Sequence, residues 1–331
     1  MRQLSLLVLL SGCSASTVDL DLLSTMEATS RGVAVHDGGH LASVAMADQI
    51  CQVDLTTGEV VADTDPSAAT ESLLDARGNF ALALSDGLFE LPLGGDVKSI
   101  PFTVAPIDGR ITDDGVVALY DADGACGVAR WNGTDASGFT TDALACDGAV
   151  GVDASADATW IADGGLVASI LNDGTVNLYD VGADIVAWNA ADQLAVVGLR
   201  GDNRVRGLRT DGTAAWEIQV AGDLQAVDAA STEGLVVLSV TDAVGGRVVV
   251  LDGTNGDTLV EHVVPEAVGV AIADDGRSLA LSTSDAIYFY GVDPKASPLD
   301  TPTTTQVAGI AGVSGATAFV GTTLAIVAIV D

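Results

Sequence analysis

The chain has 331 residues, of which 48% are hydrophobic but only 4% aromatic, so any core must be largely aliphatic. Its formal net charge is −33, from 13 basic and 46 acidic residues. This balance argues against nucleic acid as a partner, because there is no basic patch to neutralise phosphates. It also opposes broad adsorption to anionic lipid headgroups. Two interpretations of the charge stay open: solubility, or a surface for basic partners or divalent cations.

The first thirteen residues have the pattern of an export signal. A charged start is followed by the apolar stretch Leu4–Leu10 and then by small residues. The stretch is too short to span a bilayer, so we interpret residues 1–12 as a signal peptide. Leu10-Ser11-Gly12-Cys13 resembles the lipobox of bacterial lipoproteins. An ordinary secretory signal with an incidental cysteine is the alternative.

The lipobox resemblance implies cleavage before Cys13, a diacylglyceryl thioether on its sulfur and acylation of the new amino terminus. Residues 13–16 would then be a lipidated tether, and the acyl chains would hold the protein on a membrane. Ser14 follows the cysteine, which resembles the pattern that sorts lipoproteins to the outer membrane. We therefore expect a location at the bacterial cell envelope, on the outer membrane and either periplasmic or surface-exposed.

From residue 17 onward one phrase recurs, a turn rich in Asp and Gly followed by a short apolar strand. The cleanest copy is Asp274–Leu281, and copies lie about forty residues apart, the spacing of a repeat architecture. The copies begin at residues 37, 76, 114, 156, 191, 232, 274 and 314.

A second phrase, strand, polar turn with Gly, strand, follows at residues 51–61, 207–217 and 248–260. Each repeat therefore accommodates about four short strands, and no stretch has a convincing helical period. One small sheet cannot bury both of its faces, whereas ring closure stacks sheet on sheet. We predict a single all-β propeller domain over residues 17–331.

The second phrase also carries a family resemblance. Val250–Leu259 is similar to the strand-turn-strand of quinoprotein-like propellers, and residues 54–60 follow the same pattern. The repeats as a whole resemble those of bacterial β-propellers, both WD40-like and quinoprotein-like (PQQ-type). Only Ala215-Trp216-Glu217 keeps the tryptophan that often follows the turn. In general plan the chain resembles outer-membrane assembly lipoproteins of the quinoprotein-like group, which implies protein binding.

The number of blades depends on the two ends of the chain. The C-terminal residues 306–331 contain three candidate strands, at 307–311, in the last copy of the apolar phrase and at 324–330. Thr17–Leu23 is one alternating strand near the N-terminus. Pairing these ends would close the ring by hydrogen bonds between terminal strands and give eight blades of four antiparallel strands. Seven blades with an extra segment is the alternative. Residues 294–302 would be a long loop.

Three cysteines remain in the exported part. Cys126 and Cys146 are twenty residues apart, a separation that suits neighbouring strands of one blade, and we predict a disulfide between them. Cys51 lies in an alternating apolar run and is expected to be a small buried residue.

Two clusters are candidate binding sites. Asp121 and Asp123 resemble the start of a calcium loop, although ordinary turn aspartates explain them as well. The basic cluster could bind a carboxylate or a protein partner, or be neutralised by nearby acids. That cluster consists of Arg200, Arg204, Arg206 and Arg209.

The leading functional hypothesis is a non-enzymatic, lipid-anchored module that binds protein partners at the envelope. It needs no catalytic residue and no cofactor, with Ca²⁺ as the one possible ion, and we expect a monomer. One alternative is a propeller enzyme, a quinone- or calcium-dependent dehydrogenase or lactonase, which needs convergent carboxylates at the axis. The other is an extracellular carbohydrate-binding or adhesion module, which exposed tryptophans would favour.

Overall fold

The computed structural model describes two parts of the chain. The first is residues 17–295 apart from 37, 39, 47–48, 65–71, 93–95, 104, 113–114, 134–135, 142–143, 147–149, 155–157, 172, 184, 190–192, 199, 201–202, 231–232, 244, 265 and 267. The second is residues 304–305, 318–320 and 325–326. The chain divides into two units, Val18–Asp293 on the one hand and Met1–Thr17 with Pro294–Asp331 on the other.

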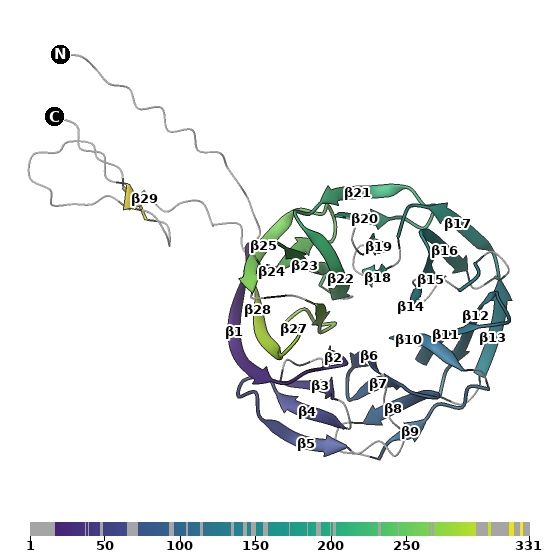
Figure 1. Cartoon of the computed structure of the whole chain (residues 1–331). Coiled ribbons are helices and arrows are strands. Elements are labelled where there is room, and N and C mark those ends of the chain that lie inside the picture. Colours follow the sequence, from purple (N-terminus) through teal and green to yellow (C-terminus); the bar gives the residue numbers. More distant parts are fainter. Residues whose placement is uncertain are drawn as a thin grey trace, which may run out of the picture. The chain divides into compact units, whose positions relative to one another are not determined.

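Val18–Asp293 is a β-propeller. In the residues described, it contains seven four-stranded antiparallel sheets, which stand around a common axis as the blades of a ring (Figure 1). In six blades the four strands are consecutive in the sequence. The first strand of each blade is the innermost and packs beside the first strand of the next blade.

The strand bounds of the first three blades are β2 (Gly32–Val35), β3 (Leu41–Ala45), β4 (Ile50–Asp54) and β5 (Val60–Thr64); β6 (Ser72–Arg77), β7 (Phe80–Leu84), β8 (Leu88–Pro92) and β9 (Lys98–Ser99); and β10 (Pro106–Thr112), β11 (Gly115–Asp121), β12 (Cys126–Trp131) and β13 (Ala136–Thr141). The next three are β14 (Val150–Ala154), β15 (Ala158–Asp163), β16 (Leu166–Leu171) and β17 (Val176–Asp180); β18 (Ile185–Asn189), β19 (Leu194–Gly198), β20 (Arg204–Leu208) and β21 (Ala214–Gln219); and β22 (Asp223–Ala230), β23 (Leu235–Asp242), β24 (Gly245–Asp252) and β25 (Thr258–Val264). The closing blade is formed by β26 (Gly269–Ile272), β27 (Ser278–Ser282), β28 (Ala286–Lys295) and β1 (Thr17–Glu27).

The recurring apolar phrase of the sequence is the second strand of each blade. Seven of its eight copies coincide with β3, β7, β11, β15, β19, β23 and β27. Each of these strands has a sheet neighbour on both sides and faces another blade on both surfaces, so β15 and β19 are buried along their whole length. Such burial on both faces explains an unbroken apolar run instead of alternation.

The turn of the second phrase is fixed by its aspartate and glycine. Asp54 Oδ1 accepts the amide N–H of Thr56 at 2.8 Å, and its carbonyl accepts that of Gly58 at 2.8 Å. The equivalent turn after β24 repeats both bonds, with Asp252 in place of Asp54. Gly58 and Gly256 have φ angles of 72° and 77°, a region that favours glycine. The aspartate and the glycine that recur in the second phrase therefore stabilise the local turn.

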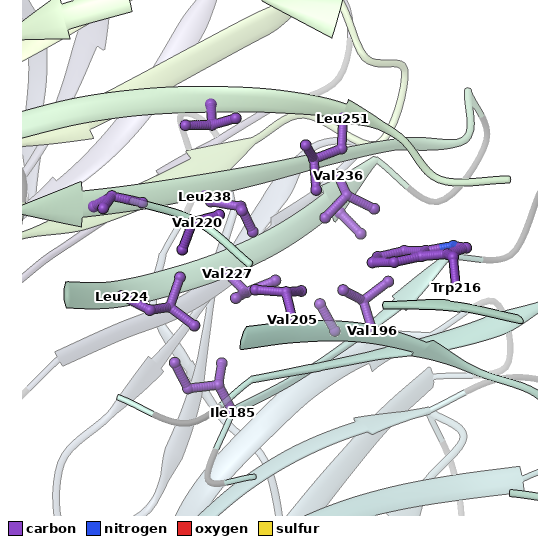
Figure 2. Close-up of a cluster of buried hydrophobic side chains, with 14 of the residues drawn as sticks. Ile185, Val196, Val205, Trp216, Val220, Leu224, Val227, Val236, Leu238 and Leu251 are labelled. Carbon is purple, nitrogen blue, oxygen red and sulfur yellow. The ribbon is translucent and has the colours of Figure 1, made fainter. Parts of the chain in front are cut away.

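The core is a series of aliphatic clusters between adjacent blades. Figure 2 shows the cluster between the blades of β18–β21 and β22–β25, where Val205, Leu224 and Leu238 are fully buried. Trp216 closes one end of this cluster, and its indole Nε1–H donates to the carbonyl of Gly253 at 2.6 Å. Burial of this kind stabilises by about 25 cal/mol per Å² of apolar surface.

The prediction of eight blades is wrong, and the alternative of seven is right. The N-terminal strand β1 does close the ring, but its partner is β28 and not the segment 324–330. The sheet β26–β28 has three strands and lacks an outer one, and β1 completes it as the fourth. The last copy of the apolar phrase forms β30 (Ala318–Val320), in a three-stranded sheet with β29 (Thr304–Thr305) and β31 (Ala325–Ile326). The predicted strand at 307–311 and most of the predicted loop at 294–302 lie outside the described residues.

Within the part of the chain that the structure describes, there is no helix with the length and apolar character needed to span a bilayer.

Candidate functional site

Aspartates on the innermost strands join neighbouring blades at the ring axis. Asp75 on β6 accepts the amide N–H of Ile111 on β10 at 2.8 Å through Oδ2. Asp108 on β10 accepts that of Val152 on β14 at 2.8 Å. Each carboxylate thus satisfies a backbone donor of the next blade that its own sheet cannot pair.

The same contact occurs where the ring closes. Asp228 on β22 accepts the amide N–H of Ile272 on β26 at 2.9 Å, through Oδ2 again. We call Asp75, Asp108 and Asp228 the axial aspartates. Because β26 belongs to the closing blade, the bond from Asp228 attaches that blade to the one before it.

Arg110 on β10 is the cation among these carboxylates. Its Nη1 donates to the carbonyl oxygens of Leu74 at 2.9 Å and Gly109 at 3.0 Å, and lies 3.7 Å from Asp108 Oδ1. The side chain is still one-quarter exposed. Burial lowers the pKa of Arg110, but the surrounding carboxylates, Asp108 first, raise it above its ordinary value, so the guanidinium stays charged.

Asp75, Arg110 and Asp228 border a cavity of about 310 Å³ at the inner strands. Its walls come from β2, β6, β22 and β26, and its charged lining residues are Arg31, Asp75, Arg110 and Asp228. A concave site in which a few charged side chains converge is a candidate binding pocket.

Burial changes the acidity of two of the carboxyls. It raises the pKa of Asp75 to about 6 and that of Asp228 to about 7, while the charge of Arg110 lowers both. At neutral pH the cavity therefore has carboxyls close to their titration midpoint, and a cation bound there would shift them toward the ionised form.

The structure brings the predicted cysteine pair together. Cys126 at the start of β12 and Cys146 after β13 are joined by a disulfide, with Cα atoms 5.1 Å apart. Cys146 is also held by its amide N–H, which donates to Asp163 Oδ2 at 2.8 Å. Cys51 is a buried free thiol. Cys13 lies outside the described residues.

The two candidate calcium ligands occupy an exposed turn between β11 and β12. Asp121 Oδ1 accepts the amide N–H of Gly124 at 2.8 Å, and Asp123 has a φ of 58°. Among the described residues, no group of three or more His, Cys, Asp or Glu side chains is placed to hold a metal ion. The contacts that the structure gives Asp121 are those of a turn aspartate.

The basic cluster is spread over β20 and its flanking turns. Arg204 and Arg206 occupy alternating positions and so share one face of β20. Arg206 forms an ion pair with Glu217 and donates to the carbonyl of Val181 at 2.9 Å, and Arg209 donates to that of Ala214 at 3.3 Å. Arg200 is exposed in the turn before β20. Local neutralisation therefore accounts for Arg206.

Sequence reasoning missed the axial aspartates and Arg110. A signal was present: an aliphatic residue, then Asp, then Ala or Gly in the first strand of four repeats. These triplets are Leu74-Asp75-Ala76, Ile107-Asp108-Gly109, Val152-Asp153-Ala154 and Val227-Asp228-Ala229. Trp160 and Trp216 are buried, so these two tryptophans do not form the exposed surface that the carbohydrate-binding alternative requires.

Comparison with known proteins supports the fold alone. No protein-family model matches the chain, and no curated protein matches it. The chain is similar in structure to the β-propeller domain of Myceliophteria thermophila Cps50 (Swd1), with a TM-score of 0.64. The match covers 83% of this chain and 100% of that one, at 14% sequence identity. The likeness identifies the molecule as a β-propeller.

Proposed function

We propose that this protein is a non-enzymatic, lipid-anchored β-propeller that binds a basic protein partner at the bacterial cell envelope. The observation that carries the proposal is the cavity at the ring axis. There Asp75 and Asp228 line the wall beside the guanidinium groups of Arg31 and Arg110, in a chain of net charge −33.

Charge complementarity selects the partner class. A strongly acidic surface attracts and orients a positively charged protein, and a concave site with unequal charge gives the contact a fixed position. A lysine or arginine of the partner can enter the cavity and pair with Asp75 and Asp228. A rigid ring of seven blades holds these groups at fixed positions, which lowers the conformational cost of binding.

The membrane part of the proposal rests on the lipobox-like residues Leu10–Cys13. Acyl chains on Cys13 would confine the propeller to the membrane surface, where each buried methylene adds about 0.8 kcal/mol. The partner is then expected in the same compartment, as an envelope protein.

A capture experiment tests the proposal. The acylated full-length protein is used as bait in detergent-solubilised envelope membranes, beside the variant Asp75→Asn/Asp228→Asn. Asparagine keeps an oxygen that can accept the N–H of Ile111 or Ile272 but removes the charge. The matched control is Asp121→Asn/Asp123→Asn, which removes two charges from an exposed turn.

We expect the wild type and the control to recover one reproducible basic protein, and the cavity variant to lose it. Raising the salt concentration should weaken recovery by the wild type, because the contact is electrostatic. Failure to recover a partner in repeated captures, or equal recovery by the cavity variant, would overturn the proposal.

A further inference from the structure

The exposed apolar side chains of the propeller are gathered on one arc of its circumference. Among the described residues, the large exposed hydrophobic side chains are Leu22, Leu23, Val60, Val61, Leu178, Val263 and Val268. Five of these seven belong to β1, β5 and β25, the outer strands of three consecutive blades (Figure 1). We call Leu22, Leu23, Val60, Val61 and Val263 the apolar rim.

Contacts within the propeller connect this rim along β1. Val264 belongs to the same buried cluster as Val18, so the end of β25 lies near the beginning of β1. Val263, the residue before Val264, is 71% exposed on the other face of β25. Further along, the hydroxyl of Ser24 donates to the carbonyl of Leu55 at 2.6 Å, in the turn that leads into β5. The rim therefore follows the N-terminal strand from its beginning to the neighbouring blade.

The length of chain before β1 indicates what covers the rim. Cys13 precedes Val18 by five residues, which span at most about 17 Å when fully extended. A lipid on Cys13 would therefore keep the beginning of β1, and the nearby end of β25, close to the bilayer. Apolar side chains in that position can enter the boundary between headgroups and acyl chains.

We infer that the apolar rim rests on the lipid bilayer and fixes the orientation of the propeller on the membrane. The inference rests on the lipid anchor of the proposed function and adds to it a second contact with the same membrane. A lipid anchor together with a protein surface gives more stable attachment than one contact alone.

The charges along the rim specify the kind of lipid surface. Asp21, Glu59 and Glu261 are exposed between the apolar residues. These carboxylates would be repelled by anionic headgroups, so the rim suits a zwitterionic surface.

Tryptophan placed on the rim reports contact with lipid. The full-length acylated variants Val61→Trp and Val263→Trp are reconstituted in phosphatidylcholine vesicles containing a brominated lipid as quencher. The matched control is Leu178→Trp on β17, a site 48% exposed on a blade outside the arc. The spectrum of the wild type, with its four tryptophans, is subtracted from each.

We expect the new tryptophan at positions 61 and 263 to be quenched at least about twofold more strongly than at position 178. Replacing part of the phosphatidylcholine with phosphatidylglycerol should reduce this difference. Equal quenching at all three positions, or none at 61 and 263, would overturn the inference while leaving the anchor intact. A chain that mass spectrometry finds without acyl groups, and that stays off the vesicles, would overturn both.

Discussion

The closing blade and the blade of β10–β13 contain the same four-stranded sheet but are held together in different ways. The strands β10–β13 follow one another in the sequence. A disulfide between two cysteines twenty residues apart links β12 to the segment after β13. The closing blade joins β26–β28 to β1 from the other end of the chain, and the hydroxyl of Thr29 reaches the carbonyl of Ser284 across 255 residues.

This difference indicates which part of the propeller should unfold first. A local blade can form from adjacent hairpins, whereas β1 and β28 meet from opposite ends of the propeller's sequence. The entropic cost of closing so long a loop is larger than that of closing a short one. Among the described residues, no disulfide links β1 to β28. We therefore expect the pairing of β1 with β28 to break before the sheets made of consecutive strands unfold.

We expect the largest loss of stability when the packing of β1 in the closing blade is disrupted. Val18 is 4% exposed and packs with Leu279 and Tyr290, so Val18→Asp would place an unpaired charge in an aliphatic cluster. We expect a loss of about 3–4 kcal/mol in the free energy of unfolding, measured by urea denaturation. The exposed Val263→Asp is the control and should change it by less than about 0.5 kcal/mol. Equal effects of the two variants would show that β1 is dispensable.

The second effect concerns the local blade. Replacing Cys126 and Cys146 by alanine removes a cross-link over twenty residues, which should lower the free energy of unfolding by about 3 kcal/mol. Reduction of the wild type should lower its melting temperature to that of the variant. If reduction leaves the wild-type melting temperature unchanged, the pair does not form a disulfide.

Part of this architecture could be predicted from the sequence because it depends on interactions between residues close together in the chain. The turn of Asp54 and Gly58 and the buried run of β19 each depend on neighbours in the sequence, so the repeat and the all-β fold could be predicted. The disulfide pair was predicted from its spacing, and the structure joins the two cysteines.

The rest depends on contacts between distant parts of the chain. Thr17–Leu23 could be identified as a strand, but nothing in its own residues distinguishes β28 from a C-terminal segment as its partner. The axial aspartates were missed for a similar reason: Asp75 and Ile111 are 36 residues apart, and Asp228 and Ile272 are 44 apart. Their shared triplet is visible in the sequence, but its role becomes clear only when adjacent blades meet at the axis.

We expect the smallest change in stability at the junction between β22 and the closing blade. Burial raises the pKa of Asp228 to about 7, from an ordinary value of 3.8, so between these values the folded protein holds a proton that the unfolded chain has released. The stability from this group is therefore complete below about pH 4 and is lost as the pH rises through about 7.

Asp228→Asn removes this titration but keeps an acceptor for the N–H of Ile272. We expect the melting temperature of the wild type to fall between pH 5 and pH 8 more steeply than that of the variant. At pH 8 the variant should be more stable by about 1–2 kcal/mol, since the partly exposed carboxyl is screened by water in the cavity. The control Asp123→Asn, in an exposed turn, should keep the wild-type slope. Parallel slopes for wild type and Asp228→Asn would mean that this carboxyl is already ionised, and that the closing junction does not respond to pH through it.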